Sequence, residues 1–184
     1  MLNENLVLIP ATSVKGAISH RTAFQWNKLN HFYAGSSEAK VGTNNPAVKA
    51  LFGSEGEKDA NNKMVNQARG NVLFSDVIEK KLDDKILNHV AIDRFTGGAI
   101  DGALFSEKTT YGKDQQFTLS ILVKSDALKD ETIKNAFEEA MKDICKGMLP
   151  LGGGVNRGNG VFTGSLFEND VEVYPTNKGK ENQL

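Results

Sequence analysis

The part of the chain best suited to binding chemistry is a glycine-rich stretch near its C-terminal end. Five glycines between Gly152 and Gly160 surround one arginine, Arg157. Because glycine has no Cβ, backbone N–H groups in such a stretch can turn toward an anion, and Arg157 adds charge and a planar fork of donors. The phosphate of an RNA backbone would suit this site. A tight crossing from helix to strand that only glycine can make explains the same composition equally well.

The glycine-rich stretch is not a P-loop. It follows a predicted helix instead of opening one, and it lacks the Gly-Lys-Ser/Thr ending of that motif. Nucleotide binding of the P-loop type is therefore not expected.

A second candidate for anion binding lies at the start of the first predicted helix, where Ser13, Lys15 and Gly16 occur together. A helix N-terminus presents free N–H groups and partial positive charge, so Ser13 and Lys15 could bracket one phosphate. The more common arrangement is a capping residue, Thr12 or Ser13, followed by a solvated lysine. Both interpretations fit the sequence.

A third candidate is the pair Asp93 and Arg94, which follows an apolar stretch and precedes the flexible segment Phe95-Thr96-Gly97-Gly98. Arg94 could contact RNA, while Asp93 orients Arg94 or the neighbouring backbone. An ion pair at the end of a strand is the alternative.

The remaining reactive side chains give no sign of catalysis. His20, His31 and His89 lie in different segments without metal-ligand spacing, so a histidine-based ribonuclease would need the fold to gather His20 or His31 with a lysine or tyrosine. Cys145 is the only cysteine, which excludes an internal disulfide and a multi-cysteine zinc site, and its helical apolar surroundings predict a buried thiol. We expect no catalytic residue, no metal and no cofactor.

The composition predicts one soluble domain. The chain has 184 residues, of which 39% are hydrophobic, and it lacks an apolar run long enough to cross a bilayer or to form a signal peptide. We therefore expect a cytoplasmic protein without membrane contact. The net charge of −1 argues against a protein that holds nucleic acid by bulk positive charge, so RNA binding would depend on local features.

The elements that must position these residues follow from apolar periodicity and from Gly and Pro. The pattern predicts an α+β fold with helices on one face of an antiparallel sheet that includes long ribbons. We expect a single domain over residues 1–175, a mobile insertion at about 54–70 and a polar flexible tail over 176–184. Strands are predicted at Leu6–Ile9, Val72–Ile78, His89–Phe95, Ala103–Thr109, Phe117–Val123 and Val161–Glu168, and helices at Val14–Trp26, Pro46–Gly53 and Asp130–Lys146.

Three segments together resemble the marks of the RAMP superfamily and occur in the order typical of that family. They are Ile9–Gly16, then Ala91–Ala99 with Leu104-Phe105 and Glu107 after it, and then Leu151–Gly154 leading to Arg157–Gly160. The resemblance spans Leu6 to about Phe167 and is closest to the repeated backbone subunits of type III CRISPR effector complexes.

This resemblance implies a modified ferredoxin-like (RRM-like) fold with a β-hairpin thumb, which Asp93 to Tyr111 would form. It also implies that the protein grips the guide-RNA (crRNA) backbone, that copies stack along the RNA and that thumbs kink the guide–target duplex. The implied partners are guide RNA, target RNA, other CRISPR effector subunits and further copies of this chain. The predicted RNA contacts are Ser13, Lys15, Gly16, Arg21, Asp93, Arg94, Thr96, Gly153, Gly154, Asn156, Arg157 and Gly158.

The chain departs from the family pattern at its start. Related subunits normally carry a first core strand, and a loop whose aspartate cuts target RNA, ahead of the segment that corresponds to Ile9–Gly16. The strand could come from another chain, from the product of a partner gene, or from a part of this protein ahead of the given sequence, and without it the sheet would have an unpaired edge. A guide-RNA-binding scaffold is thus the leading hypothesis. The alternatives are a RAMP-family endoribonuclease that cuts target or precursor RNA, and a small anion- or nucleotide-binding α+β domain.

Overall fold

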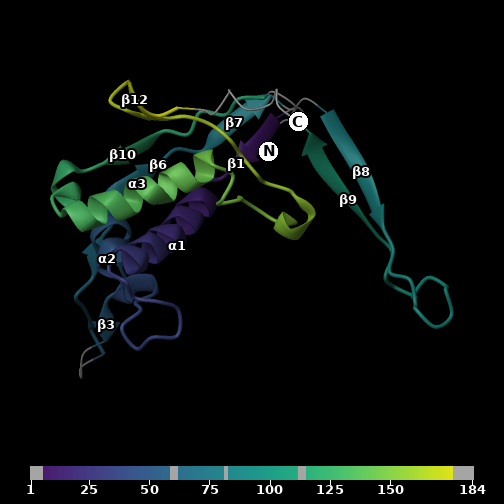
Figure 1. The fold of residues 1–184 in the computed structure, drawn as a ribbon, viewed down its shortest axis with the longest axis horizontal. Helices are drawn as coiled ribbons and strands as arrows, with labels where there is room; N and C mark the ends of the chain where they lie inside the picture. Colours follow the sequence, from purple (N-terminus) through teal and green to yellow (C-terminus); the bar gives the residue numbers. More distant parts are fainter. Residues whose placement is uncertain (1–5, 59–61, 81–82, 112–114, 176–184) are drawn as a thin grey trace. The chain divides into compact units, whose positions relative to one another are not determined.

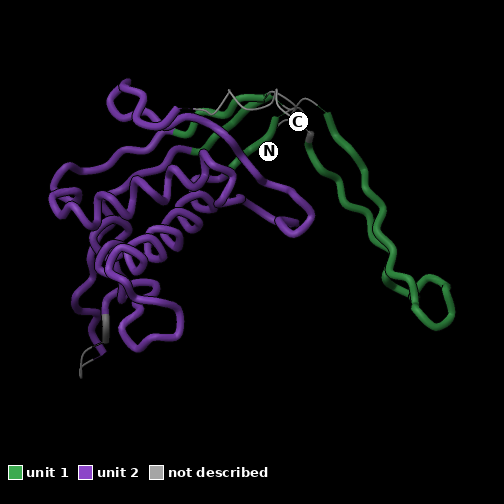
Figure 2. The backbone as a smooth tube through the Cα atoms, in the orientation of Figure 1, with its two compact units in different colours: residues 1–9, 76–119 green, residues 10–75, 120–184 purple. Residues whose placement is uncertain are grey.

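The structure of the protein is a computed structural model that describes residues 6–58, 62–80, 83–111 and 115–175. The chain forms two compact units, shown in different colours in Figure 2. Unit 1 comprises residues 1–9 and 76–119, and unit 2 comprises residues 10–75 and 120–184. The single domain over residues 1–175 stays a prediction. The predicted flexible tail lies outside the described residues.

The core of unit 2 is built by three helices: α1 (Ala11–Leu29), α2 (Pro46–Phe52) and α3 (Glu131–Cys145). The helices α1 and α3 lie side by side (Figure 1). Ile18 of α1, Leu51 of α2 and Phe137 of α3 are fully buried. Burial of each such side chain contributes about 1.5–3 kcal/mol, so this three-helix contact fixes the frame that carries the candidate residues of unit 2.

The capping residues explain where two of these helices begin. The helix α3 begins after Asp130, whose Oδ1 accepts hydrogen bonds from the N–H groups of Thr132 at 2.8 Å and Ile133 at 3.2 Å. The predicted cap of α1 by Thr12 or Ser13 is wrong, because α1 starts directly after Pro10, whose carbonyl accepts from the N–H groups of Ser13 and Val14. Ser13 therefore lies inside the first turn of the helix.

A two-stranded antiparallel sheet of β6 (Val72–Phe74) and β10 (Ile121–Val123) belongs to the same unit. Along β6, Val72 is buried and Leu73 is exposed, as alternation requires when helices cover one face. The prediction of single strands over Val72–Ile78 and Phe117–Val123 is wrong in length. The ladder ends where Ser75 and Ser120 bond to each other, after which the chain enters the other unit.

Two further hairpins complete unit 2. In the predicted mobile insertion, β2 (Gly53–Ser54) pairs with β5 (Ala68–Arg69), and β3 (Glu57–Lys58) pairs with β4 (Met64–Val65). The insertion is thus a β-hairpin arm rather than an irregular loop, and its mobility stays a prediction. The last predicted strand is limited to β11 (Leu166–Glu168), which pairs with β12 (Val171–Tyr174) across a turn at Asn169 and Asp170 with positive φ angles.

Unit 1 contains β1 (Leu6–Ile9) paired with β7 (Val77–Lys80), and a longer ribbon of β8 (Asp83–His89) with β9 (Phe105–Tyr111). All seven residue pairs of the ribbon are antiparallel and in register. The prediction of a strand over His89–Phe95 is wrong, because β8 ends at His89 and the chain then turns. Mixed helices and small antiparallel sheets confirm the α+β class.

Candidate functional site

Four of the predicted contacts lie along α1, in unit 2. Ser13 and Gly16 are exposed and Lys15 is half-buried in the first turns of the helix. The N–H of Ser13 already donates to the carbonyl of Pro10 at 3.0 Å, so the Ser13 hydroxyl and the Lys15 ammonium are the groups that remain to meet an anion. The geometry therefore favours a side-chain site over a backbone site here.

Arg21, the fourth of these residues, has a partner that the sequence did not reveal. Its Nε donates to Oδ2 of Asp143 at 2.6 Å, and Nε2 of Gln25 donates to the same oxygen at 2.5 Å. The guanidinium carbon also lies 4.6 Å from the centre of the Phe24 ring, within cation–π range. Arg21 and Asp143 are 122 positions apart, and no local pattern could have paired them.

The glycine-rich stretch forms a closed loop, which we call the glycine loop (residues 151–160). The N–H of Leu151 donates to the carbonyl of Gly160 at 2.9 Å and closes the loop at its stem. Gly160 has a φ of +72°, and a Cβ there would lie 1.9 Å from the Leu151 oxygen. Only glycine can occupy this position without opening the stem.

Within the glycine loop, a short 3₁₀ helix over Val155–Arg157 is flanked by Gly154 and Gly158, both in the left-handed region. The carbonyl of Gly154 accepts from the N–H of Arg157 at 2.8 Å, and that of Val155 accepts from Gly158 at 2.9 Å. These N–H groups are therefore used inside the loop. The tight-crossing explanation thus accounts for part of the glycine content, and the predicted anion contact of this loop would depend chiefly on Arg157.

Arg157 is exposed, and its position is defined by the loop itself. Its Nη2 lies 3.4 Å from the point that a Cβ on Gly154 would occupy, so the guanidinium lies back over the loop. Gly153 and Asn156 are exposed beside it. The loop therefore presents the Arg157 guanidinium on a surface of small residues. A phosphate could approach such a surface closely.

The remaining predicted contacts lie in unit 1, in the loop that joins β8 to β9. Oδ1 of Asp93 accepts from the N–H groups of Phe95 at 2.7 Å and Thr96 at 3.2 Å, and its backbone pairs with Gly97 and Gly98. The hydrogen bond from Phe95, and then that from Thr96, lower the pKa of Asp93 below its ordinary value. Of the two roles considered for this carboxylate, the structure shows the one that orients the neighbouring backbone.

The turn held by Asp93 leaves Arg94 exposed and Phe95 97% exposed. An isolated bridge between Ile92 and Ala99 closes the turn, so the ribbon ends in a defined tip rather than a loose loop. We call residues 90–104 the ribbon tip.

The predicted residues are divided between the two units. The α1 residues and the glycine loop share unit 2, where Asp143 links them: its carboxylate binds Arg21, and its carbonyl accepts from the N–H groups of Met148 and Leu149 just before the loop. Asp93, Arg94 and Thr96 belong to unit 1.

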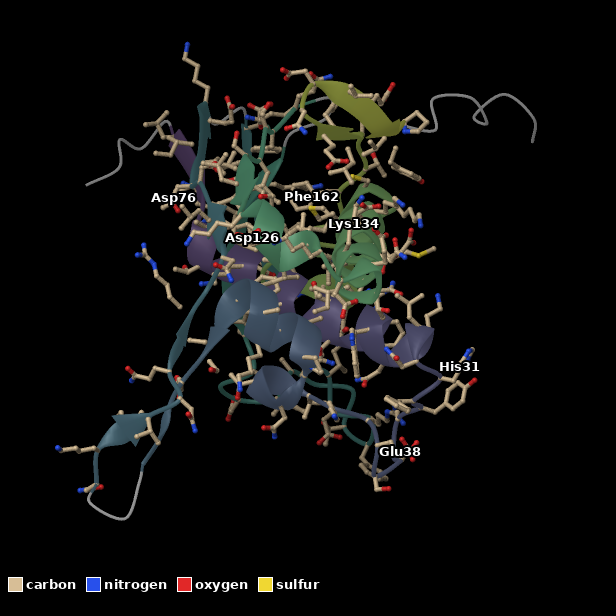
Figure 3. The ribbon with its side chains drawn as sticks, turned by 90° about the vertical axis from the view of Figure 1, so that its left-hand side faces the viewer. His31, Glu38, Asp76, Asp126, Lys134 and Phe162 are labelled. Atoms are coloured by element: carbon tan, nitrogen blue, oxygen red, sulfur yellow. The ribbon has the colours of Figure 1, made fainter. Side chains whose placement is uncertain are left out.

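One histidine acquires a carboxylate neighbour across the ribbon. Nε2 of His89 lies 3.3 Å from Oε2 of Glu107, and the His89 ring stacks on Phe105 with 4.8 Å between ring centres. Cross-strand pairing makes this contact, which sequence spacing alone could not show. His20 is exposed, as is His31, which lies just beyond the end of α1 (Figure 3).

The described residues show neither a metal cluster nor a membrane span. No three His, Cys, Asp or Glu side chains among them gather as metal ligands. None of the helices in the described ranges is long and apolar enough to cross a bilayer. Cys145 is half-buried, and burial raises the pKa of its thiol, which disfavours the reactive thiolate.

The chain matches a known protein family. The family model of the RAMP superfamily matches residues 2–163, a range that includes α1, the β8–β9 ribbon, α3 and the glycine loop. No curated protein matches the chain.

Proposed function

This chain belongs to the RAMP superfamily, and we propose that it is a guide-RNA-binding scaffold subunit of a CRISPR ribonucleoprotein complex similar to type III. The family indicates a CRISPR-associated role in RNA binding. The observation that supports the finer proposal is that the matched range, residues 2–163, takes in α1, the ribbon and the glycine loop. The partners are guide RNA, target RNA and other effector subunits, in the cytoplasm, with copies of the chain stacked along the guide.

The guide backbone is held by unit 2 in this proposal. Because the whole chain carries a net charge of −1, affinity must come from a few well-placed cations rather than from the overall charge. Lys15 and Arg157 are such cations, and each stands beside small residues that let a phosphate approach. The proposed contacts in this unit are Ser13, Lys15, Gly16, Arg21, Gly153, Gly154, Asn156, Arg157 and Gly158.

The ribbon tip acts on the guide–target duplex. Phe95 and Leu104 are 97% and 70% exposed, and apolar side chains held this openly in water favour a partner that covers them. The hydrogen bonds of Asp93 form the turn before the partner arrives, so little conformational entropy is lost on binding. Phe95 would lie against a base-pair step, with Arg94 and Thr96 on the adjoining phosphates.

The experiment that tests this function measures the affinity of the full chain for a labelled, unstructured single-stranded RNA at several salt concentrations. Lys15→Ala and Arg157→Ala should each weaken binding, and each should reduce the salt slope by about 0.7, the value for one phosphate of a single strand that the protein no longer neutralises. Lys129→Ala is the matched control, since Lys129 is exposed and pairs with the exposed Asp126 on the surface. If the wild-type chain fails to bind RNA at low salt, the proposed function is wrong.

A further inference from the structure

The contact between Arg21 and Asp143 has a role beyond joining two helices. We infer that Asp143 is a positioning residue that orients the Arg21 guanidinium to bind an RNA phosphate beside the stem of the glycine loop. This inference rests on the proposed function and deepens it, because it names the residue that organises the phosphate site.

Two contacts fix the plane of the guanidinium. Nε of Arg21 donates to Oδ2 of Asp143 at 2.6 Å, and the guanidinium carbon lies 4.6 Å from the centre of the Phe24 ring. Phe24 and Gln25 follow Arg21 by three and four positions, so all three project from the same side of α1. Gln25 donates to the same carboxylate oxygen at 2.5 Å and holds Asp143 in place.

The burial of the pair is uneven, and this leaves one edge of Arg21 open. The Asp143 side chain is 5% exposed, whereas that of Arg21 is 24% exposed. In the described part of the chain, the terminal amino groups Nη1 and Nη2 meet no hydrogen-bond acceptor, since the bond to Asp143 uses Nε. A guanidinium fixed in this way presents a two-pronged edge, which matches the geometry of a phosphate.

Stability alone does not explain this ion pair. Taking two charges out of water costs free energy, and apolar residues of similar size often replace a buried pair without loss of stability. The helices α1 and α3 already share a close-packed core that includes Ile18 and Phe137. The pair is better explained by what its open edge can bind.

The backbone of Asp143 ties this arginine to the glycine loop. Its carbonyl accepts from the N–H groups of Met148 at 2.8 Å and Leu149 at 3.1 Å, which form the segment that enters the loop. The loop stem closes two residues later, between Leu151 and Gly160. One residue therefore contacts Arg21 through its carboxylate and holds, through its carbonyl, the segment that leads into the loop that carries Arg157.

The test compares the affinities of Asp143→Asn and Arg21→Lys for the same labelled single-stranded RNA. Simple electrostatics predicts that Asp143→Asn tightens binding, because it removes a negative charge. Positioning predicts the opposite, a loss of roughly tenfold, which is the usual size of one missing charge-assisted bond. Arg21→Lys should lose a similar factor, since an ammonium has no second edge to offer while it pairs with Asp143. Asp126→Asn, an exposed aspartate on the surface, is the matched control.

A double-mutant cycle decides whether the effect passes through Arg21. In the Arg21→Ala background, Asp143→Asn should cause no further loss of affinity. The inference is overturned if Asp143→Asn binds as tightly as wild type, if it loses the same factor without Arg21, or if Arg21→Lys keeps full affinity. Should Asp143→Asn fail to fold, Arg21→Lys decides alone. Wild-type binding that depends on Lys15 and Arg157 but not on Arg21 would refute this inference and leave the proposed function standing.

Discussion

Replacing Gly160 by alanine should open the stem of the glycine loop. Gly160 has a φ of +72°, and a Cβ added there would lie 1.9 Å from the carbonyl oxygen of Leu151. That approach is impossible, so the stem must separate and the hydrogen bond from the N–H of Leu151 to the carbonyl of Gly160, 2.9 Å long, must break. The substitution therefore tests the closed loop on which the position of Arg157 depends.

The expected cost has two parts. A residue with a Cβ in the left-handed region costs about 1–2 kcal/mol, and the broken hydrogen bond costs about 1 kcal/mol, so Gly160→Ala should lower the free energy of unfolding by about 2–3 kcal/mol. Gly158 has a φ of +85° but open space around it, so Gly158→Ala should cost only the first part, about 1–2 kcal/mol. Gly153 has no positive φ, and an added Cβ there would meet no atom within 4 Å, so Gly153→Ala should change stability by less than about 1 kcal/mol.

Denaturant unfolding followed by circular dichroism measures these three differences, and RNA affinity is measured on the same samples. The order of cost should be Gly160, then Gly158, then Gly153, and Gly160→Ala should also weaken RNA binding because Arg157 moves with the stem. Equal stability of Gly160→Ala and Gly153→Ala would refute the closed-loop geometry.

Three further predictions concern other parts of the fold. Asp130→Ala removes the cap of α3 and should lower stability by about 1 kcal/mol in thermal unfolding, while Asp130→Ser should retain most of it; an unchanged melting temperature in the alanine variant would contradict the capping role. Phe95→Ser should leave stability unchanged, because the side chain is 97% exposed, but should weaken binding to a guide–target duplex more than to the single strand; equal loss on both RNAs would exclude a role at the duplex. Because the pKa of Asp93 is lowered, its carboxylate stays charged and holds the turn at pH 3.8, the ordinary value of this pKa, and at every higher pH. The contribution to stability is lost as the pH falls through the lowered pKa. The amide signals of Phe95 and Thr96 in NMR should therefore stay constant down to that value and shift only below it, and a shift at higher pH would show that the carboxylate does not hold the turn.

Elements with strong local signals were predicted well. The helix predicted at Asp130–Lys146 is observed at Glu131–Cys145, one residue shorter at each end, since Asp130 is its cap and Gly147, with a φ of +75°, follows its end. The helix α2 is marked in the same way by Pro46 at its first position and Gly53 after its end. In both cases the information lies within a few consecutive residues.

Strands with a weak apolar pattern, and strands that lie in one common apolar run, were not predicted correctly. The strand β8 begins with Asp83, Asp84 and Lys85, which are all exposed. This segment lacks the alternation of apolar and polar residues that predicts a strand. The apolar run from Val72 to Ile78 concealed two strands with different partners, since a short run cannot reveal where pairing changes.

In the candidate site too, features within a short segment could be predicted from the sequence, whereas contacts between distant segments could not. The sequence located glycines and cations that lie near each other along the chain, and the resemblance to the RAMP superfamily is confirmed. Contacts between distant segments, such as Arg21 with Asp143 and His89 with Glu107, depend on helix packing and on strand register, which no local pattern encodes. The assignment of the individual RNA contacts stays a prediction.

The most direct test of the central claim is to sequence the RNA that co-purifies with the full chain from cells that carry a CRISPR repeat array. A guide-binding subunit should be enriched in short RNAs that contain repeat sequence, and the combined Lys15→Ala and Arg157→Ala variant should lose that enrichment while Lys129→Ala keeps it. Recovery of no RNA, or of RNA without repeat sequence, would contradict the claim that this protein holds a guide.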